Sequence, residues 1–228
     1  YKVDSTMQEF TSQKFLDYVD RVQTMLVYYI ETASFVDTED PQWTFFFLYE
    51  KRKQSNSEFR YATVGFLSMY NYYAYPEKIR SRISQVLVLP NYQHCGHGSE
   101  LVESVYRDAS RLSEIIDITA ESPSPEFVKI RDYVTTKMCS SLASFQDAQK
   151  LKSGFNNEMA QEALKYFKIP KLQSRRVYEI LRLHVTNSNL EEEWRSYRLD
   201  IKKRFYMPFI RRSKYARNAG SVLDEQYN

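Results

Sequence analysis

The chain has 228 residues, of which 43% are hydrophobic and 27% charged, and its net charge is +3. This length allows one large domain or two small ones with a sizeable core, and the composition is that of an ordinary globular protein. Its apolar runs are too short to cross a membrane, so we expect no membrane partner. Two cysteines, Cys95 and Cys139, make no disulfide framework, which favours a reducing compartment.

The first part of the chain alternates between helical and strand patterns. An amphipathic helix is predicted where apolar residues keep helical spacing, and antiparallel strands where aromatic and β-branched residues gather between polar turns. A run that is apolar on both faces predicts a further, central strand. In chain order, the predicted elements are a helix over residues 12–30, strands over 45–51, 61–75 and 82–89, a helix over 99–109, the central strand over 115–121 and a helix over 126–138.

Antiparallel strands followed by a strand–helix–strand–helix unit predict a mixed α+β domain rather than a doubly wound sheet. After about residue 150 only helical spacing remains, so we expect a helical subdomain over 150–228 beside a first domain over 1–149. His184 falls on an apolar helix face there and is expected to be a packed core residue. The basic run over 202–217, which has no acid, is typical of a solvated helix face, and no direct nucleic-acid binding is expected.

A glycine-containing turn, Gln-His-Cys-Gly-His-Gly, separates the strand over 82–89 from the helix that follows. Glycines between a strand and a helix let the backbone approach an anion, because the first N–H groups of the helix point at it. The spacing Gln-x-x-Gly-x-Gly resembles the pyrophosphate cradle of the GNAT acetyltransferases, which bind acetyl-CoA. The candidate cofactor residues are Gln93, His94, Cys95, Gly96, His97, Gly98 and Ser99.

Other chemistry at this turn is less well supported. His94, Cys95 and His97 crowd one short loop without the ligand spacing of a metal site, so no metal is expected. A nucleophilic Cys95 would need a neighbouring base and a lowered pKa, and this is the weaker interpretation.

Longer strings of residues narrow the resemblance to one family of acetyltransferases. They are Ile-Glu-Thr-Ala-Ser-Phe at 30–35, Tyr-Asn-Tyr-Tyr at 70–73, Asp-Ile-Thr-Ala-Glu at 117–121, Arg-Val-Tyr-Glu-Ile-Leu-Arg-Leu at 176–183 and Arg-Ser-Tyr-Arg-Leu-Asp-Ile-Lys at 195–202. From Tyr1 to about Pro208 the chain closely resembles the type B histone acetyltransferase catalytic subunits of the GNAT superfamily. Because it begins at Tyr1, inside patterned sequence, we expect it to be part of a longer protein and to lack the N-terminal domain of that family.

The resemblance implies a GNAT fold, a mixed and mostly antiparallel sheet flanked by helices, with a C-terminal helical subdomain. It implies acetyl-CoA as cosubstrate and lysines on the tail of histone four, and with it histone three, as acceptors. It also implies a WD-repeat histone chaperone as partner and a location in the nucleus and cytoplasm.

Acetyl transfer needs a base, because the amine of free lysine titrates near ~10.4. Glu121 ends the predicted central strand beside the glycine turn. The pattern alone supports a charged residue that closes a strand equally well, and the resemblance decides for a general base. By resemblance, Glu31 is a second carboxylate that faces the substrate lysine. Ser122 stands where the family usually has an acid, so either the surroundings of Glu121 are less negative than in the family or Glu31 carries more of the task.

The remaining candidates also rest on the resemblance. The backbone of Val86, Leu87 and Val88 is expected to pair with pantetheine, with one N–H facing the thioester oxygen. Ser124 matches a position near the cofactor, although a serine before proline is also an ordinary turn residue.

A second group is expected to bind the histone tail. Tyr70, Asn71 and Tyr72 match the segment that lines the tail groove, and Trp43 lies close to the acids at 37–40, which suit a basic tail. Because strand faces alternate, packing against a neighbouring strand explains about half of these residues equally well.

Two functions from different classes remain open. The leading one is a histone lysine acetyltransferase that transfers acetyl directly from acetyl-CoA, with Glu121 as general base. The alternative is a histone-tail-binding module with weak or no catalysis. A small-molecule N-acetyltransferase is disfavoured because the resemblance to the histone acetyltransferases includes the helical subdomain and the aromatic segment.

Overall fold

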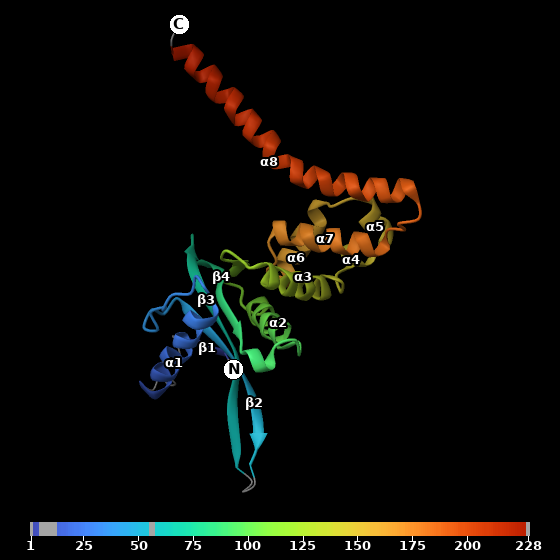
Figure 1. Cartoon of the computed structure of the whole chain (residues 1–228). Helices are drawn as coiled ribbons and strands as arrows, with labels where there is room; N and C mark the ends of the chain where they lie inside the picture. The colour runs from blue at the N-terminus through green and yellow to red at the C-terminus, as the bar shows by residue number, and fades with distance from the viewer. Residues whose placement is uncertain (1, 5–12, 55–57, 227–228) are drawn as a thin grey trace.

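The computed structural model describes residues 2–4, 13–54 and 58–226 (Figure 1). Within these residues the strands form a single mixed sheet in the order β1-β2-β3-β4-β5. The first four strands are antiparallel neighbours, and β5 runs parallel to β4. The strands are β1 (Lys2–Asp4), β2 (Trp43–Lys53), β3 (Phe59–Ala74), β4 (Lys78–Val88) and β5 (Ile115–Ala120).

Helices cover both faces of the sheet, and further helices follow it in the chain (Figure 1). The predicted mixed α+β, GNAT-type arrangement is confirmed by this order of elements, because four antiparallel strands lead into the β4–α2–β5–α3 unit. The helices are α1 (Gln13–Tyr29), α2 (His97–Ser110), α3 (Pro125–Cys139), α4 (Ala143–Gln146), α5 (Ala148–Ser153), α6 (Asn157–Phe167), α7 (Lys171–Val185) and α8 (Glu191–Gln226), with a short 3-10 turn η1 (Pro90–Tyr92).

Two apolar cores form because side chains alternate between the faces of the sheet. On one face, α1 packs Val19 and Leu26 against Phe45 and Phe66. The other face holds a larger core that joins the sheet to α2, α3, α6 and α7. The predicted apolar stripe of α2 is confirmed within it, since Leu101, Val102, Val105 and Ala109 are all buried. Burying one such aliphatic side chain contributes about 1.5–3 kcal/mol.

The prediction that residues 115–121 form a central strand is wrong. β5 lies at the edge of the sheet that the described residues form, with β4 as its neighbour. Its apolar character has another cause, because helical segments cover its outer edge. The Ile118 N–H donates to the Lys168 carbonyl (2.9 Å), and the Ile118 carbonyl accepts from the Arg131 guanidinium (3.0 Å).

The helical region predicted after about residue 150 is confirmed, and its last helix, α8, runs through Pro208 to Gln226. The division into domains at residue 149 stays a prediction. The expectation for His184 is wrong, because its side chain is exposed on α7. In the described ranges no helix is both long and apolar enough to span a membrane.

Candidate functional site

The two strands that carry the predicted cofactor and base residues diverge at one point. β5 pairs with β4 from Ile79 to Ile83, and the Glu121 N–H donates to the Ile83 carbonyl over 2.9 Å. Beyond that bond the chain turns away at Ser122, whose φ is 34°. Residues 84–88 of β4 therefore keep β3 on one edge and have no strand of the described ranges on the other.

The free edge of β4 offers hydrogen-bonding groups at the predicted pantetheine residues. Leu89 N–H donates to Val64 of β3 at 2.9 Å. Because successive N–H groups of a strand point to opposite edges, those of Val88 and Val86 face the opening, and that of Leu87 faces β3. The Val88 carbonyl, on the open side, accepts from the Gln93 side-chain amide at 2.9 Å.

The glycine turn has the geometry of an anion cradle. Gly96, the residue before α2, has φ 87°, a left-handed conformation that glycine adopts without strain. Gly98 lies in the first turn of α2, where an added Cβ would come within 3.1 Å of the Ile130 side chain. Within the described ranges, the N–H groups of residues 94–98 donate to no acceptor. Free N–H groups at a helix start attract an anion.

The polar side chains of the turn are mostly exposed. His94, with φ 62°, and Cys95 lie at its tip, and Ser99 is half-buried in α2. The His97 ring meets the Tyr92 ring edge-on at 6.4 Å between centroids, and its Nδ1 lies 3.8 Å from the Glu100 carboxylate.

The structure gives Ser124 a local role. Its side-chain oxygen accepts from the Phe127 N–H at 3.2 Å and so caps the N-terminus of α3. This bond supports the interpretation of Ser124 as a turn residue and accounts for it without a cofactor.

Glu121 is exposed beside the point where β4 and β5 separate. Its neighbour Ala120 packs against the larger core, so the alternation of side chains directs Glu121 to the opposite face of the sheet, the face that α1 covers. Glu31, also exposed, follows α1 in the loop over residues 30–42. Both candidate carboxylates therefore belong to the α1 side of the sheet.

The loop over 30–42 is tied to the sheet and to α1 by side-chain amides. Gln85 of β4 donates to the Ser34 carbonyl (2.8 Å), and Gln23 of α1 exchanges two hydrogen bonds with the backbone of Val36 (2.6 and 3.2 Å). Asp37 and Asp40 accept from backbone N–H groups two residues on, which shapes the turns of this loop.

Three of the predicted tail-binding residues lie together. The Tyr70 ring lies 4.9 Å from Trp43 and 4.7 Å from Tyr72, both in edge-on geometry. The pKa of Tyr70 is raised by desolvation and by the charge of Asp40, which places that acid beside the ring. Arg82 lies over the Tyr72 ring at 4.9 Å. This aromatic wall is on the α1 side, the same side as the two glutamates.

Asn71 is separated from the two tyrosines. Its side chain points to the opposite face, where it donates to Thr44 (2.9 Å) and accepts from Ser81 (2.8 Å). The alternation of strand faces explains this difference. The structure therefore removes Asn71 from the aromatic wall and gives it a role in joining β2, β3 and β4.

Several residues of this region escaped the sequence prediction. The guanidinium of Arg80 makes a two-pronged ion pair with the buried Asp117 carboxylate (2.6 and 3.0 Å), which joins β4 to β5 below the divergence point. Arg82 and Gln85 were also missed. The only signal in the sequence was the polar alternation at residues 78–82. The strand was predicted to begin at residue 82, so most of this alternation fell outside it.

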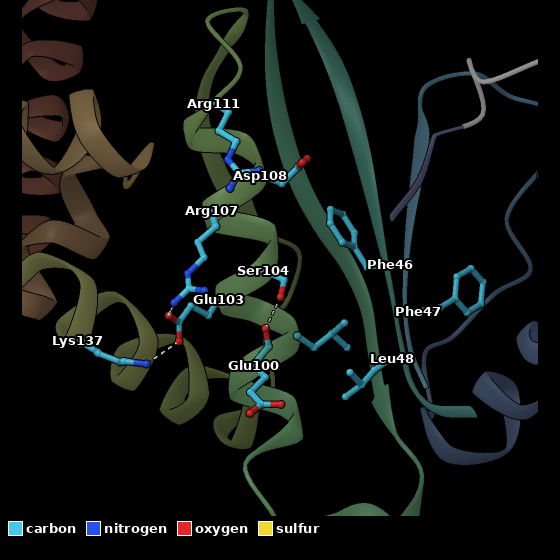
Figure 2. Close-up of a pocket in the computed structure, with 11 residues that line it drawn as sticks. Phe46, Phe47, Leu48, Glu100, Glu103, Ser104, Arg107, Asp108, Arg111 and Lys137 are labelled. Atoms are coloured by element: carbon cyan, nitrogen blue, oxygen red, sulfur yellow. Dashed lines mark hydrogen bonds and ion pairs between the residues drawn. The ribbon is translucent and has the colours of Figure 1, made fainter. Parts of the chain in front are cut away.

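A separate hollow of about 560 Å³ lies between α2, β2 and Lys137 of α3. Figure 2 shows the residues that line it. Three of its charged residues pair with one another: Glu103 accepts from Lys137 at 2.8 Å and also pairs with Arg107. The lining residues include none of the predicted site residues, so this cavity is not the candidate site.

Metal and thiol chemistry find no support in the part of the chain that the structure describes. No group of three or more His, Cys, Asp or Glu residues is arranged there to hold a metal ion. Cys139 is buried in the larger core, and desolvation raises the pKa of its thiol to about 12. Cys95 is exposed.

The comparisons with known proteins agree with the resemblance read from the sequence. Residues 131–183 match the family model described as "Histone acetyltransferase type B catalytic subunit, C-terminal". The chain is 45% identical to the human type B catalytic subunit over 214 residues, 94% of this chain and 49% of the relative. It is 35% identical to a Dictyostelium discoideum subunit, over 86% of this chain and 41% of that protein.

The chain thus spans about half the length of these curated relatives. A solved aminoglycoside acetyltransferase from a soil metagenome covers 63% of the chain with 16% identity and a TM-score of 0.34, which is too distant to support an argument. The sequence identity to the type B subunits extends through the β4–β5 divergence, the glycine turn and the helices that follow. Over 94% of its length the chain is therefore similar to the type B histone acetyltransferase catalytic subunits, and residues 131–183 match the model of their C-terminal part.

Proposed function

We propose that this chain transfers an acetyl group from acetyl-CoA directly to a lysine of a histone tail, that of histone four, with Glu121 as general base. One observation carries the proposal: β4 and β5 separate where Glu121 leaves the sheet, and the free edge of β4 leads from that point to the glycine turn. A thioester bound along this edge would end beside a carboxylate.

The described residues fit acetyl-CoA. The pyrophosphate would lie on the free N–H groups of residues 94–98, where Gly96 supplies the left-handed turn. The pantetheine arm would pair with the open edge of β4 at Val86 and Val88, and one of these N–H groups would stabilise the oxyanion that forms as the amine attacks. Gln93, which bonds to the Val88 carbonyl, would fix the turn against the strand.

Glu121 would act on the acceptor amine. The amine must lose a proton to attack the thioester, and an exposed carboxylate at the divergence point can take it directly or through one water. The bond that forms joins the lysine nitrogen to the acetyl carbon, and the bond that breaks releases the CoA thiol. Glu31 would be a second carboxylate near the incoming amine, and Ser122 would leave Glu121 without an acidic neighbour in sequence.

The aromatic wall suits a basic peptide. Trp43, Tyr70 and Tyr72 offer ring faces and edges to aliphatic and cationic side chains, and Asp40 places a negative charge beside them. From the similarity to the type B subunits we propose a WD-repeat histone chaperone as partner, histone three as an accompanying ligand, and action in the nucleus and cytoplasm.

One assay separates the two functions that the sequence left open. Acetyl transfer is measured with acetyl-CoA and either a histone-four tail peptide or a free polyamine, with binding of the same peptide measured by calorimetry. The proposal expects turnover on the peptide and little on the polyamine. Binding of the peptide without turnover would instead support the tail-binding module, and preference for the polyamine would support a small-molecule acetyltransferase.

A further inference from the structure

Two buried glutamines hold the backbone of one loop from opposite sides. Gln85 of β4 is 7% exposed and donates its amide to the Ser34 carbonyl, and Gln23 of α1 is 1% exposed and brackets Val36 with a donated and an accepted bond. We call these two side chains the glutamine clamp. It fixes two carbonyls and one N–H of a segment that has no regular secondary structure of its own.

The surroundings of the clamp are apolar. Ile30, Ala33 and Val36 pack the loop against the core under α1, and Leu87 borders Gln85 in that core. An amide buried there must be hydrogen-bonded to offset its lost hydration. Yet the second amide atom of Gln85, Oε1, has no partner among the described residues, and neither does the Ser68 hydroxyl across the strand pair. Among the described residues, the hydrogen bond to the loop is therefore the one bond that offsets the desolvation of the Gln85 amide.

Residues 83–85 of β4 bind both the loop and the segment that leaves the sheet at the divergence point. The Ile83 carbonyl accepts from Glu121, and Gln85 holds Ser34, three residues after Glu31. The next residues, Val86 to Val88, form the open edge of β4. One short stretch of strand therefore fixes the backbones behind both candidate carboxylates and continues as the proposed cofactor edge.

We propose that the glutamine clamp is a positioning device for acetyl transfer. Gln85 and Gln23 hold the loop so that Glu31 and the acids after it stand at a fixed place relative to the β4 edge and Glu121. This inference rests on the proposed function, because the value of the clamp lies in the placement of groups that act on the acceptor lysine. Neither glutamine touches the reacting atoms.

The first test replaces Gln85 by Met, which keeps the length of the side chain and removes its hydrogen bonding. Gln173→Met is the matched control, because Gln173 is a 5% exposed amide that donates to Asp132 and Thr135 between α3 and α7. Amide hydrogen exchange over residues 30–42 should accelerate on the order of tenfold in Gln85→Met and stay unchanged in the control.

Kinetics on the same variants show whether the loop matters for transfer. In Gln85→Met, kcat with the tail peptide should fall about ten- to a hundredfold, because misplaced groups lose their alignment. The affinity for acetyl-CoA should stay within about twofold, since the glycine turn is untouched. The clamp is overturned if amide hydrogen exchange over residues 30–42 is the same in Gln85→Met as in the control. It is also overturned if Gln85→Met loses only affinity for acetyl-CoA. Absence of turnover in the unaltered chain refutes the proposed function instead, and the exchange arm still decides whether the clamp holds the loop.

A second variant separates the bond from the shape. The carboxylate introduced by Gln85→Glu cannot donate to the Ser34 carbonyl, but once protonated its O–H can. Because burial raises the pKa of such a carboxyl, the turnover of Gln85→Glu relative to the unaltered chain should rise as the pH falls, while the ratio for Gln85→Met stays flat. Flat ratios in both variants would contradict the hydrogen bond as the cause.

Discussion

The N–H of Glu121 donates to the Ile83 carbonyl across 2.9 Å, and it is the last bond that joins the segment after β5 to β4 in the described structure. Past this bond the segment after β5 separates from β4, and the free edge of β4 begins. The backbone of the proposed base is therefore placed by the sheet itself. Since sheet spacing is rigid, the backbone of Glu121 stands at a fixed distance from the edge of β4 before any substrate binds.

The glycine turn gives the first prediction. Gly96→Ala places a Cβ at φ 87°, which strains the turn and tilts the free N–H groups, so affinity for acetyl-CoA should fall about tenfold by calorimetry. Gly154→Ala is the matched control: Gly154 has φ 117°, and an added Cβ there meets nothing within 4 Å, as at Gly96. Gly154→Ala should lose at least as much thermal stability as Gly96→Ala, because φ 117° with ψ 165° is a conformation that essentially only glycine adopts. Equal affinity for acetyl-CoA in the two would remove the turn from the cofactor site.

The acids of the loop give the second prediction. Asp37 and Asp40 each accept a backbone N–H, a role that asparagine can fill, so the triple change Asp37→Asn, Glu39→Gln and Asp40→Asn should leave the loop intact. Exposed charges attract a basic tail with a screening length of about 8 Å in physiological salt. The variant should show a flatter rise of the peptide KM with salt and an unchanged kcat. An unaltered salt slope would mean that these acids do not steer the peptide.

Tyr72→Ala serves as the contrasting variant for that experiment. The Tyr72 ring packs edge-on against Tyr70, and such contacts are not screened by salt. Its loss should raise the peptide KM by a similar factor at every salt concentration.

The third prediction concerns the ion pair below the divergence point. The side chain of Asp117 is 5% exposed and that of Arg80 is 57% exposed, so the two partners should respond differently to removal. Arg80→Met leaves a buried carboxylate without its partner and should cost about 3 kcal/mol in the free energy of unfolding. Asp117→Asn leaves an arginine that water can solvate and should cost about 1–2 kcal/mol. Denaturant titration tests the order, and equal losses would contradict the asymmetry.

The fourth prediction uses the ion pairs in Figure 2. A hydrogen bond from Lys137, together with the charge of Arg107, holds the pKa of Glu103 below its ordinary value of 4.5. A carboxyl with a lowered pKa stabilises the fold above its ordinary pKa, and the gain is lost as the pH falls through the lowered value. Lys137→Met should therefore lower Tm by about 1–3 °C near neutral pH and make little difference in acid. Lys129→Met, on the same helix, should change Tm at neither pH.

The regular elements were largely predictable because each has a clear period. The helix predicted over 12–30 is α1 (Gln13–Tyr29), and that over 126–138 is α3 (Pro125–Cys139). β4 was predicted too short, because Arg80 and Lys78 face solvent and read as a polar turn. The position of β5 was misjudged, since a strand covered at its edge by Lys168 and Arg131 has the same apolar pattern as a central strand.

The candidate site was predictable in its motifs but not in its connections. The glycine turn stands out in the sequence and Glu121 follows from the resemblance, and the structure brings the turn and this carboxylate to the two ends of one free strand edge. The bonds from Gln85 to Ser34 and from Gln23 to Val36 join residues 51 and 13 positions apart, which no local pattern reveals. Asn71 shows the opposite failure, because a matching string of residues does not tell which face of a strand each side chain takes.

The central claim is that Glu121 removes the proton of the acceptor lysine. The direct measurement is single-turnover acetyl transfer to the histone-four tail peptide by Glu121→Gln across pH, with acetyl-CoA affinity measured on the same protein. The amide keeps the shape and cannot take a proton, so the rate should fall by about 10²–10⁴ and rise more steeply with pH, while acetyl-CoA affinity stays unchanged. A rate and pH profile equal to those of the unaltered chain would contradict the assignment and move the role of base to Glu31.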